Sequence, residues 1–336
     1  MRPLDRLPSI KLKFGVVIVA AVAVTAVATA VGVSAGVPRV VCALAAAALA
    51  LAMVQVLARG MTSPLREMAA ASRAMARGDH ERRVASTSRD EVGELARAFN
   101  TMAAELAEVD RMRRELIANV SHELRTPISG LQATLENLID GVEQPDRETL
   151  ELMHGQVERL GRLVAQLLDL SRLEAEGVQL ERACFEVAEL LEAVAREARS
   201  HAQESGREVE LIVDVSNGLL VYGDRDRLHQ VVANLVDNAV RHSPPGGRVV
   251  LSGARAASGV ALAVTDEGPG IPPSERSRVF ERFYRIDAAR AAAEGGTGLG
   301  LAIARGIVDL HDGSLQVEQA PAGGCRMVVV LPEGGA

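Results

Sequence analysis

Apolar residues dominate the first sixty positions and form two long runs. Residues 14–33 contain no charged side chain, and neither do residues 40–58. Each run has about 20 residues, and a helix of that length crosses the roughly 30 Å of hydrocarbon in a bilayer. The pattern therefore predicts a transmembrane hairpin over residues 14–58, with two spans in contact with membrane lipid.

Basic residues gather on both outer flanks of this hairpin. They are Arg2, Arg6, Lys11, Lys13, Arg59 and Arg66. The positive-inside rule places both flanks in the cytoplasm, so we expect a multi-pass protein of the cell membrane whose N-terminus and whose domains after the hairpin are cytoplasmic. The short outer loop suggests input from the bilayer, the cytoplasm or another membrane protein. A cleaved signal peptide is the alternative, since ATAVGVSAG offers small residues.

The apolar spacing changes after the hairpin. Residues 62–75 carry a helical stripe, and Ser63 with Pro64 are typical of a helix start. A polar connector follows at residues 77–89. Apolar residues then recur in steps of three and four, as in a coiled-coil seam: Val92, Leu95, Phe99, Met102, Leu106 and Val109. The alternative is a solvated amphipathic linker.

Two further seams predict a helical hairpin. The first consists of Ile117, Val120, Leu124, Ile128, Leu131, Leu135 and Leu138. The second consists of Leu150, Met153, Val157, Leu160, Val164 and Leu167. Such a pair leaves apolar faces uncovered, and dimerisation would complete a four-helix bundle. The phase shift before this region, near Arg113, predicts a local change of coiled-coil winding.

His122 lies off the first seam, about 200° around the helix from it, so we expect it to face water. A satisfied core histidine does not fit this position, and a metal ligand lacks a second His or Cys one turn away. Glu123 is adjacent, and a carboxylate that accepts the ring proton makes the other ring nitrogen a better nucleophile. Thr126 shares the histidine's face, and Pro127 predicts a bend.

Beyond residue 183 the pattern becomes mixed. It predicts helices at residues 187–199 and 225–242, strands at 207–215, 249–251 and 261–264, and a last strand at 326–332. In the second helix, Asn234, Asn238 and Arg241 share a face beside a buried stripe. Carboxamide oxygens suit Mg²⁺, which also bridges to nucleotide phosphates.

Glycines mark the two remaining candidate segments. DEGPGI contains Asp266, Gly268 and Gly270 at the end of a strand, where glycine lets backbone approach a ligand. GGTGLGLAI directly precedes a helix and can aim N–H groups at phosphate; its residues of interest are Gly296, Thr297, Gly298, Leu299 and Gly300. Each cluster alone is equally compatible with a structural turn.

Composition narrows the function classes. The net charge of −7 over 336 residues includes no large basic cluster, which argues against a nucleic-acid partner. The 3 cysteines are far apart, which suggests free thiols in a reducing compartment and not a disulfide framework.

These motifs together resemble the sensor histidine kinases of two-component systems. DEVGELARAFNTM is similar to the second helix of a HAMP domain, and SHELRTP to the phosphoacceptor box. NLVDNAVRHS, DEGPGI, FERFYR and GGTGLGLAI resemble, in order, the four boxes of the kinase ATP-binding domain. The implied architecture is a multidomain chain: the transmembrane hairpin, a HAMP coiled coil (59–111), a dimeric four-helix bundle (112–178) and an α/β sandwich (183–333).

The resemblance also implies roles for residues. His122 is the phosphoacceptor, Glu123 the base, and Thr126 orients water during dephosphorylation of the partner. Asn238 binds Mg²⁺, Asn234 and Arg241 lie near the ATP phosphates, and Asp266 contacts adenine. Residues 287–296 form a lid, and Arg241 with His242 depart from the frequent Lys and aromatic residue.

The implied activity is ATP-dependent phosphorylation of His122 in a homodimer. Asn234 stands where the hydrolysing relatives have a catalytic glutamate, so attack by water should be slow. No receiver-like segment follows the last strand, so we expect transfer to an aspartate of a separate response regulator, with phosphatase activity toward it. A membrane-tethered ATP-binding scaffold that signals without phosphorylation is the alternative, and a chaperone-type conformational machine is a further one.

Overall fold

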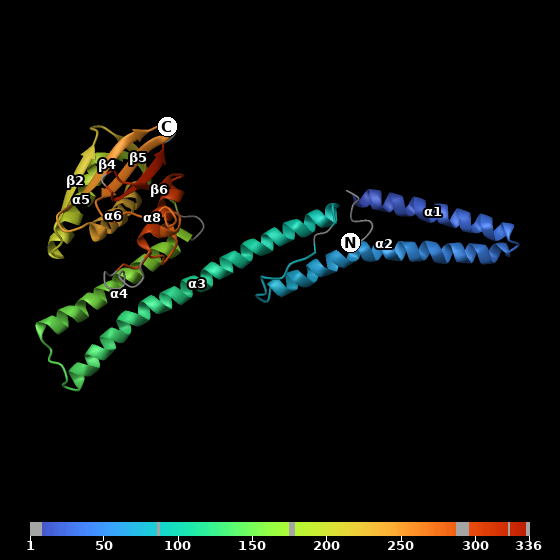
Figure 1. Cartoon of the computed structure of the whole chain (residues 1–336), viewed down its shortest axis with the longest axis horizontal. Coiled ribbons are helices and arrows are strands. Elements are labelled where there is room, and N and C mark those ends of the chain that lie inside the picture. Colours follow the sequence, from blue (N-terminus) through green and yellow to red (C-terminus); the bar gives the residue numbers. More distant parts are fainter. Residues whose placement is uncertain (1–8, 86–87, 175–178, 287–295, 322, 334–336) are drawn as a thin grey trace. The chain divides into compact units, whose positions relative to one another are not determined.

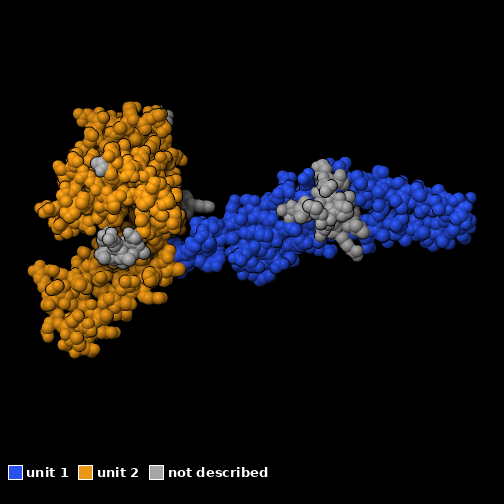
Figure 2. Space-filling model, in the orientation of Figure 1, with its two compact units in different colours: residues 1–117 blue, residues 118–336 orange. Residues whose placement is uncertain are grey.

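The computed structural model describes residues 9–85, 88–174, 179–286, 296–321 and 323–333, without the side chains of residues 56–61 and 174. The chain divides into two compact units, residues 1–117 and 118–336, which are shown in different colours in Figure 2. Each unit is described by itself.

The first unit begins with two helices, α1 (Ile10–Ser34) and α2 (Arg39–Met75), which pack against each other (Figure 1). Their large apolar side chains point outward, as with Val19 at 69% exposure and Leu44 at 67%. Exposed apolar surface of this kind is typical of a face that meets lipid or another protein. Among the described residues, α1 alone is long and apolar enough to span a membrane, because the apolar part of α2, Arg39–Gln55, is shorter. The second span therefore stays a prediction.

The predicted helix start at Ser63 and Pro64 is wrong, because α2 runs through both residues to Met75. Proline removes one backbone N–H donor. The flanking alanine, leucine, methionine and arginine residues favour helix on both sides, and Ser63 Oγ donates to Glu67 Oε1 at 3.0 Å within the helix. A local start signal was thus overridden by the helix around it.

A buried ion pair joins the start of α1 to the residue before α3 (Glu91–Ile139). Lys13 Nζ lies 2.6 Å from Asp90 Oδ2, with side-chain exposures of 7% and 3%. Burial raises the pKa of Asp90, but hydrogen bonds from Lys13, Ser88 and the Gly93 N–H outweigh it, and the pKa lies below its ordinary value. The Asp90 carboxylate therefore remains ionised at neutral pH, and its contact with Lys13 fixes this junction.

The end of α2, the connector and the start of α3 share a small core. Its members are Met68, Ala71, Val84 and Ala96, with Phe99 packed against them. Asn100 holds the connector in place, since its side chain accepts from Val84 N and donates to Val84 O, both at 2.9 Å. These contacts explain why a polar connector is ordered beside two amphipathic helices.

The second unit begins with the rest of α3, which forms the predicted helical hairpin with α4 (Arg147–Glu174). Leu163 and Leu170 are buried but lie outside the predicted seams. Of the predicted seam residues, Ile128, Leu135, Val157 and Val164 are 42–56% exposed, and others such as Leu124 and Leu160 are half-buried. About half of each predicted seam is therefore uncovered in a single chain.

The C-terminal domain contains two sheets. β1 (Arg182–Glu186) pairs antiparallel with β3 (Leu220–Asp224). The larger sheet has the order β2-β4-β5-β7-β6 and is antiparallel except for the parallel β2·β4 pair. Its strands are β2 (Val209–Val215), β4 (Gly247–Ala256), β5 (Gly259–Asp266), β6 (Ser314–Gln319) and β7 (Cys325–Pro332).

Three helices pack on the larger sheet, as Figure 1 shows: α5 (Val187–Glu204), α6 (Arg225–His242) and α8 (Gly300–Leu310). Alternate sheet residues form the core beneath them, among them Leu251, Leu262 and Val329, each at most 2% exposed. The predicted α/β sandwich is confirmed, and α6 has the predicted bounds. β1, β3, β6 and the short 3₁₀ helix Arg278–Phe280 were not predicted.

Candidate functional site

The histidine face lies on α3. The side chain of His122 is exposed, as predicted, and that of Glu123 beside it is half-buried. Thr126 is also exposed, and its hydroxyl donates to the His122 carbonyl at 3.4 Å. The helix continues through the buried Pro127, and the bend predicted there stays a prediction. The geometry therefore presents an accessible imidazole next to a carboxylate and a hydroxyl.

Helix α6 supplies the carboxamides. Asp224 caps its start by accepting from Arg227 N, and the apolar stripe that holds it on the sheet is buried as expected. That stripe consists of Leu228, Val232, Leu235 and Ala239. Asn234 and Asn238 are half-buried at the edge of this stripe, one turn apart. Packing of the stripe thus fixes the face on which both amides lie.

Asn234 carries an amide N–H₂ that no described residue satisfies. Its Nδ2 is buried and, within the described part of the chain, has no hydrogen-bond acceptor. A buried N–H₂ without an acceptor costs free energy, so its environment suits a ligand that brings one. A side chain at Gly300 would approach Asn234 Oδ1 to 3.6 Å, which places the start of α8 beside the same amide.

Asp266 is the buried carboxylate at the end of β5, 5% exposed. Its Oδ1 accepts from Gly268 N at 2.8 Å and from Cys325 N at 3.1 Å. Both bonds end on the same oxygen, so Oδ2 is the one that can accept from a ligand. Gly268 has no room for a side chain, because a Cβ there would lie 2.7 Å from the His242 carbonyl oxygen.

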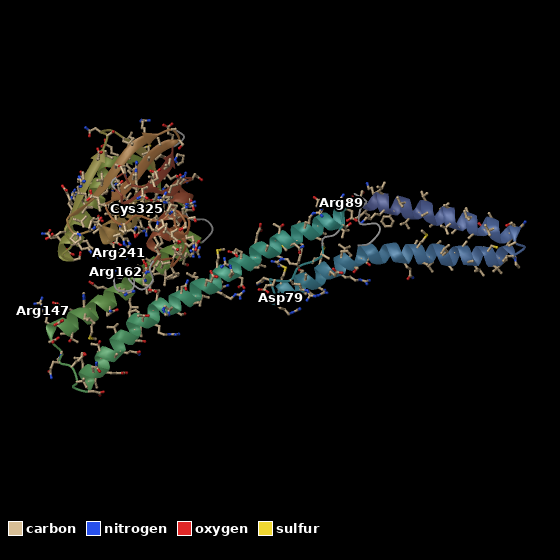
Figure 3. The ribbon with its side chains drawn as sticks, viewed as in Figure 1. Asp79, Arg89, Arg147, Arg162, Arg241 and Cys325 are labelled. Atoms are coloured by element: carbon tan, nitrogen blue, oxygen red, sulfur yellow. The ribbon has the colours of Figure 1, made fainter. Side chains whose placement is uncertain are left out.

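Burial, followed by the charge of Asp266, raises the pKa of the Cys325 thiol to about 12. A thiol with that pKa is protonated at neutral pH and is a poor nucleophile. Cys325, labelled in Figure 3, therefore takes part in the site through its backbone N–H.

The glycine segment before α8 is held by backbone contacts. Phe283 N donates to Gly298 O at 2.9 Å, which ties FERFYR to GGTGLG. Gly298 has φ +71°, and a Cβ there would lie 2.8 Å from Phe283 Cα. Glycine is required at this position, because other residues rarely adopt that φ and no space remains for a side chain. The predicted role of GGTGLG as a helix entry is confirmed.

Arg241 lies at the same segment. Its Nη2 pairs with Asp237 at 2.6 Å, and its Nη1 occupies the position that a side chain at Gly296 would need. Arg241 is labelled in Figure 3. The structure thus brings Arg241 and Gly296 together, and Asn234 together with Gly300. The predicted lid lies outside the described residues apart from Gly296.

Sequence reasoning missed two side chains of α4 that contact this domain. Gln166 Oε1 accepts from Thr297 Oγ1 at 2.6 Å, and Asp169 Oδ2 accepts from Gln230 Nε2 at 2.7 Å. In the sequence, Gln166 and Asp169 are two polar residues three positions apart beside the second seam. That pattern is also typical of a helix face that contacts solvent. The helical hairpin therefore contacts the glycine segment directly.

The residues present fit a nucleotide with Mg²⁺. No cluster of three or more His, Cys, Asp or Glu side chains suited to a metal occurs within the described ranges. Mg²⁺ in such a setting takes amide and phosphate oxygens together with water, which agrees with a carboxamide donor such as Asn238. The unpartnered Asn234 amide and the glycine segment provide donors for phosphate oxygens.

The amino-acid sequence matches three protein-family models, one after another along the chain. Residues 56–108 match the HAMP domain, residues 112–176 the His Kinase A (phospho-acceptor) domain, and residues 223–335 the Histidine kinase-, DNA gyrase B-, and HSP90-like ATPase. The exposed histidine thus lies in the second match, and the buried Asp266 with the glycine segment lies in the third.

Full-length relatives agree with these matches. The chain is 36% identical over 277 residues to the signal transduction histidine-protein kinase BaeS of Escherichia coli K12, which covers 82% of this chain and 59% of that protein. It is 38% identical over 228 residues to the sensor protein SrrB of Staphylococcus aureus NCTC 8325, which covers 67% and 39%. The chain thus spans less than two thirds of the length of either relative.

The structure resembles that of the Acinetobacter baumannii histidine kinase AdeS, with a TM-score of 0.54 and 30% identity over 64% of this chain and 98% of that chain. A structure of the histidine kinase ThkA in complex with response regulator protein TrrA has the same fold, at a TM-score of 0.57 and 24% identity over 68% of this chain and 64% of that chain. The three ordered matches and the near-complete coverage of AdeS show that the chain belongs to the sensor histidine kinases of two-component systems.

Proposed function

We propose that this protein is a membrane-anchored kinase that transfers the γ-phosphoryl group of ATP to His122. One observation carries the proposal: a single chain combines an exposed imidazole beside a carboxylate with a second domain whose buried carboxylate, unpartnered amide and glycine segment suit a nucleotide. The exposed histidine alone does not identify a phosphoryl donor, and the nucleotide site alone does not identify an acceptor.

The nucleotide is bound at the C-terminal end of β5, the central strand of the larger sheet. Asp266 Oδ2 accepts from the exocyclic amine of adenine, while its Oδ1 remains bonded to the backbone at Gly268. Gly270 gives the backbone beside the base its left-handed turn, with φ +72°. Asn234, Arg241 and the segment Gly296–Gly300, including Thr297 and Leu299, surround the phosphates.

Asn238 supplies the protein oxygen for Mg²⁺, which when bound neutralises phosphate charge and orients the γ-phosphoryl group. The chain's own contribution to transfer is positioning. One ring nitrogen of His122 attacks phosphorus as the bond to the bridging oxygen breaks and ADP leaves with the electron pair. Glu123 accepts the proton of the other ring nitrogen.

Transfer to histidine is favoured over hydrolysis by residue 234. Activation of water requires a base near the γ-phosphate. An asparagine amide at position 234 cannot accept a proton, so ATP turnover without the histidine should be slow.

The phosphoryl group then passes to an aspartate of a separate response regulator. ThkA, which has the same fold, was solved with its regulator TrrA, and we extend that type of partner to this chain. Thr126, exposed one turn from His122, is placed to orient a water for the reverse task of removing phosphate from the regulator.

Membrane attachment and dimerisation complete the proposal. α1 and the apolar part of α2 both cross the bilayer, because both expose large apolar side chains along their length. The half-exposed seams of α3 and α4 are covered by a second copy of the chain, which forms a four-helix bundle. The N-terminus and the catalytic part are cytoplasmic.

The test is phosphoryl labelling of the full chain in lipid nanodiscs with γ-labelled ATP and Mg²⁺. We expect label that acid removes and alkali does not, as for phosphohistidine, and its loss in His122→Gln. Retained label in His122→Gln would reject this residue as the acceptor. Absence of label from a chain that binds ATP would favour a scaffold that signals without phosphorylation.

A further inference from the structure

An ion pair between helices holds the carboxylate beside the histidine. Arg159 of α4 places Nη2 3.7 Å from Glu123 Oε2, and the two side chains are 20% and 22% exposed. Leu124 and Leu160, the next residues on each helix, are half-buried members of the two seams. The pair therefore lies along the edge of the hairpin's apolar contact.

The other ion pairs among the described residues of α3 and α4 have a different geometry, because each joins residues three or four apart on one helix. They are Arg111 with Glu108 and Glu115, Arg114 with Asp110, Arg147 with Glu151, His154 with Glu158, and Arg172 with Asp169. The arginines of those pairs are 56–92% exposed. Pairs of that kind contribute little and are screened by solvent. The Glu123–Arg159 pair joins two helices and is more sheltered, so it constrains where the carboxylate lies.

We infer that Arg159 is a positioning residue for phosphorylation of His122, acting through Glu123. The guanidinium engages Oε2 and thereby turns Oε1 toward the ring N–H of His122. As the other ring nitrogen bonds to the γ-phosphorus and ADP departs, that N–H proton moves to the carboxylate. The inference rests on the proposed function. It adds that phosphorylation of His122 on α3 depends on a side chain of α4.

The inference predicts a change in kcat without a change in KM. Arg159 belongs to the helical hairpin, and the nucleotide-binding residues proposed above belong to the C-terminal domain. Loss of Arg159 should therefore slow labelling at saturating ATP and leave the KM for ATP within about twofold. General-base assistance contributes roughly 100- to 10,000-fold, and partial loss of its alignment should cost about tenfold.

The experiment measures initial labelling rates of the full chain in nanodiscs for five variants: Arg159→Gln, Arg159→Lys, Glu123→Gln, the double variant with both Gln substitutions, and Arg162→Gln. Arg162 is exposed three residues further along α4 and is labelled in Figure 3, so it serves as a matched loss of charge. We expect the first variant to be about tenfold slower, with Lys restoring most of the rate. Arg162→Gln should stay within twofold of the unaltered chain.

The double variant decides whether Arg159 acts through Glu123. It should be no slower than Glu123→Gln, because the arginine then has no carboxylate to align. An unaltered rate for Arg159→Gln beside a slow Glu123→Gln would overturn the inference and leave the proposed function intact. Additive losses, or a Lys variant as slow as Gln, would also overturn it. Full activity of Glu123→Gln would reject the proposed base and the inference together.

Discussion

The helical hairpin and the C-terminal domain bury their apolar residues to very different extents. In the hairpin, Leu135 is 45% and Val157 56% exposed, whereas Leu251 and Val329 in the larger sheet are 0% exposed. Burial of an apolar side chain contributes about 1.5–3 kcal/mol. The domain thus completes its core within one chain, whereas the hairpin leaves apolar surface uncovered in one chain. Nucleotide binding can therefore be a property of one chain, and the hairpin is the region where we expect a second copy to pack.

The largest expected effect is on phosphoryl labelling, which a substitution in either region should reduce, whereas only the substitution in the C-terminal domain should weaken nucleotide binding. Asn238→Ala should weaken binding of Mg²⁺ by about 10- to 100-fold and lower labelling with it, because a ligand oxygen is lost. His122→Gln should abolish labelling and bind Mg·ATP as the unaltered chain does. Isothermal titration with a non-hydrolysable ATP analogue, beside the labelling assay, checks both. Weakened binding of Mg·ATP by His122→Gln would contradict this separation of nucleotide binding from phosphorylation.

The next effect concerns stability. Leu251→Ala should destabilise the C-terminal domain by about 2–5 kcal/mol, since it leaves a cavity in a closed core. Leu135→Ala should change the stability of that domain by less than 0.5 kcal/mol and instead weaken dimerisation. Hydrogen exchange of peptides from β4 measures the first quantity, and concentration-dependent cross-linking measures the second. Equal losses of hydrogen-exchange protection in β4 for Leu251→Ala and Leu135→Ala would contradict the conclusion drawn from the difference in burial.

A smaller effect should follow from a single methyl group in the glycine segment. Gly298→Ala forces a residue other than glycine to φ +71° and against the backbone of Phe283, at a cost of about 1–3 kcal/mol. We expect weaker ATP binding and a lower Tm for the C-terminal domain. Gly323→Ala is the matched control for conformation without crowding, because Gly323 has φ +106° and nothing within 4 Å of its Cβ position.

The smallest effect should come from the surface of the domain. A side-chain hydrogen bond from Arg248 holds the pKa of Glu267 below its ordinary value of 4.5. A depressed carboxylate pKa adds stability at pH values above 4.5, and this contribution is lost as the pH falls through the lowered pKa of the folded state. The Tm of the unaltered chain should therefore exceed that of Glu267→Gln by a small amount at pH 7, and the difference should disappear as the pH falls well below 4.5. A difference that grows with acid would contradict this assignment.

Long periodic elements could be predicted from the sequence, whereas contacts between elements could not. The buried stripe of α6 and the exposure of His122 follow from helical spacing alone. Strands β1 and β3 escaped notice because each has only 5 residues, and neither RACFE nor LVYGD alternates clearly between apolar and polar residues. Asp266 was placed correctly at a strand end, but its bond to Cys325 N depends on β7 meeting β5.

The contacts of α4 show the same limit. Arg159, Gln166 and Asp169 are polar residues beside an apolar seam, where a solvent-exposed face is the usual outcome. Their partners become visible once the rotation of each helix about its axis is known. The break predicted at Ser63 and Pro64 failed for the related reason that a local signal competes with the helix on both sides.

Two of the three thiols, Cys184 and Cys325, allow local opening of the C-terminal domain to be measured by alkylation. Cys184 is exposed and should react with an alkylating reagent within the mixing time of a labelling experiment. Cys325 is buried and protonated, so it reacts only when the start of β7 separates from the end of β5 at Asp266. The ratio of the two rates gives the population of that opened form directly. A nucleotide bound at Asp266 should slow alkylation of Cys325 in proportion to its occupancy, without any label or substitution in the protein.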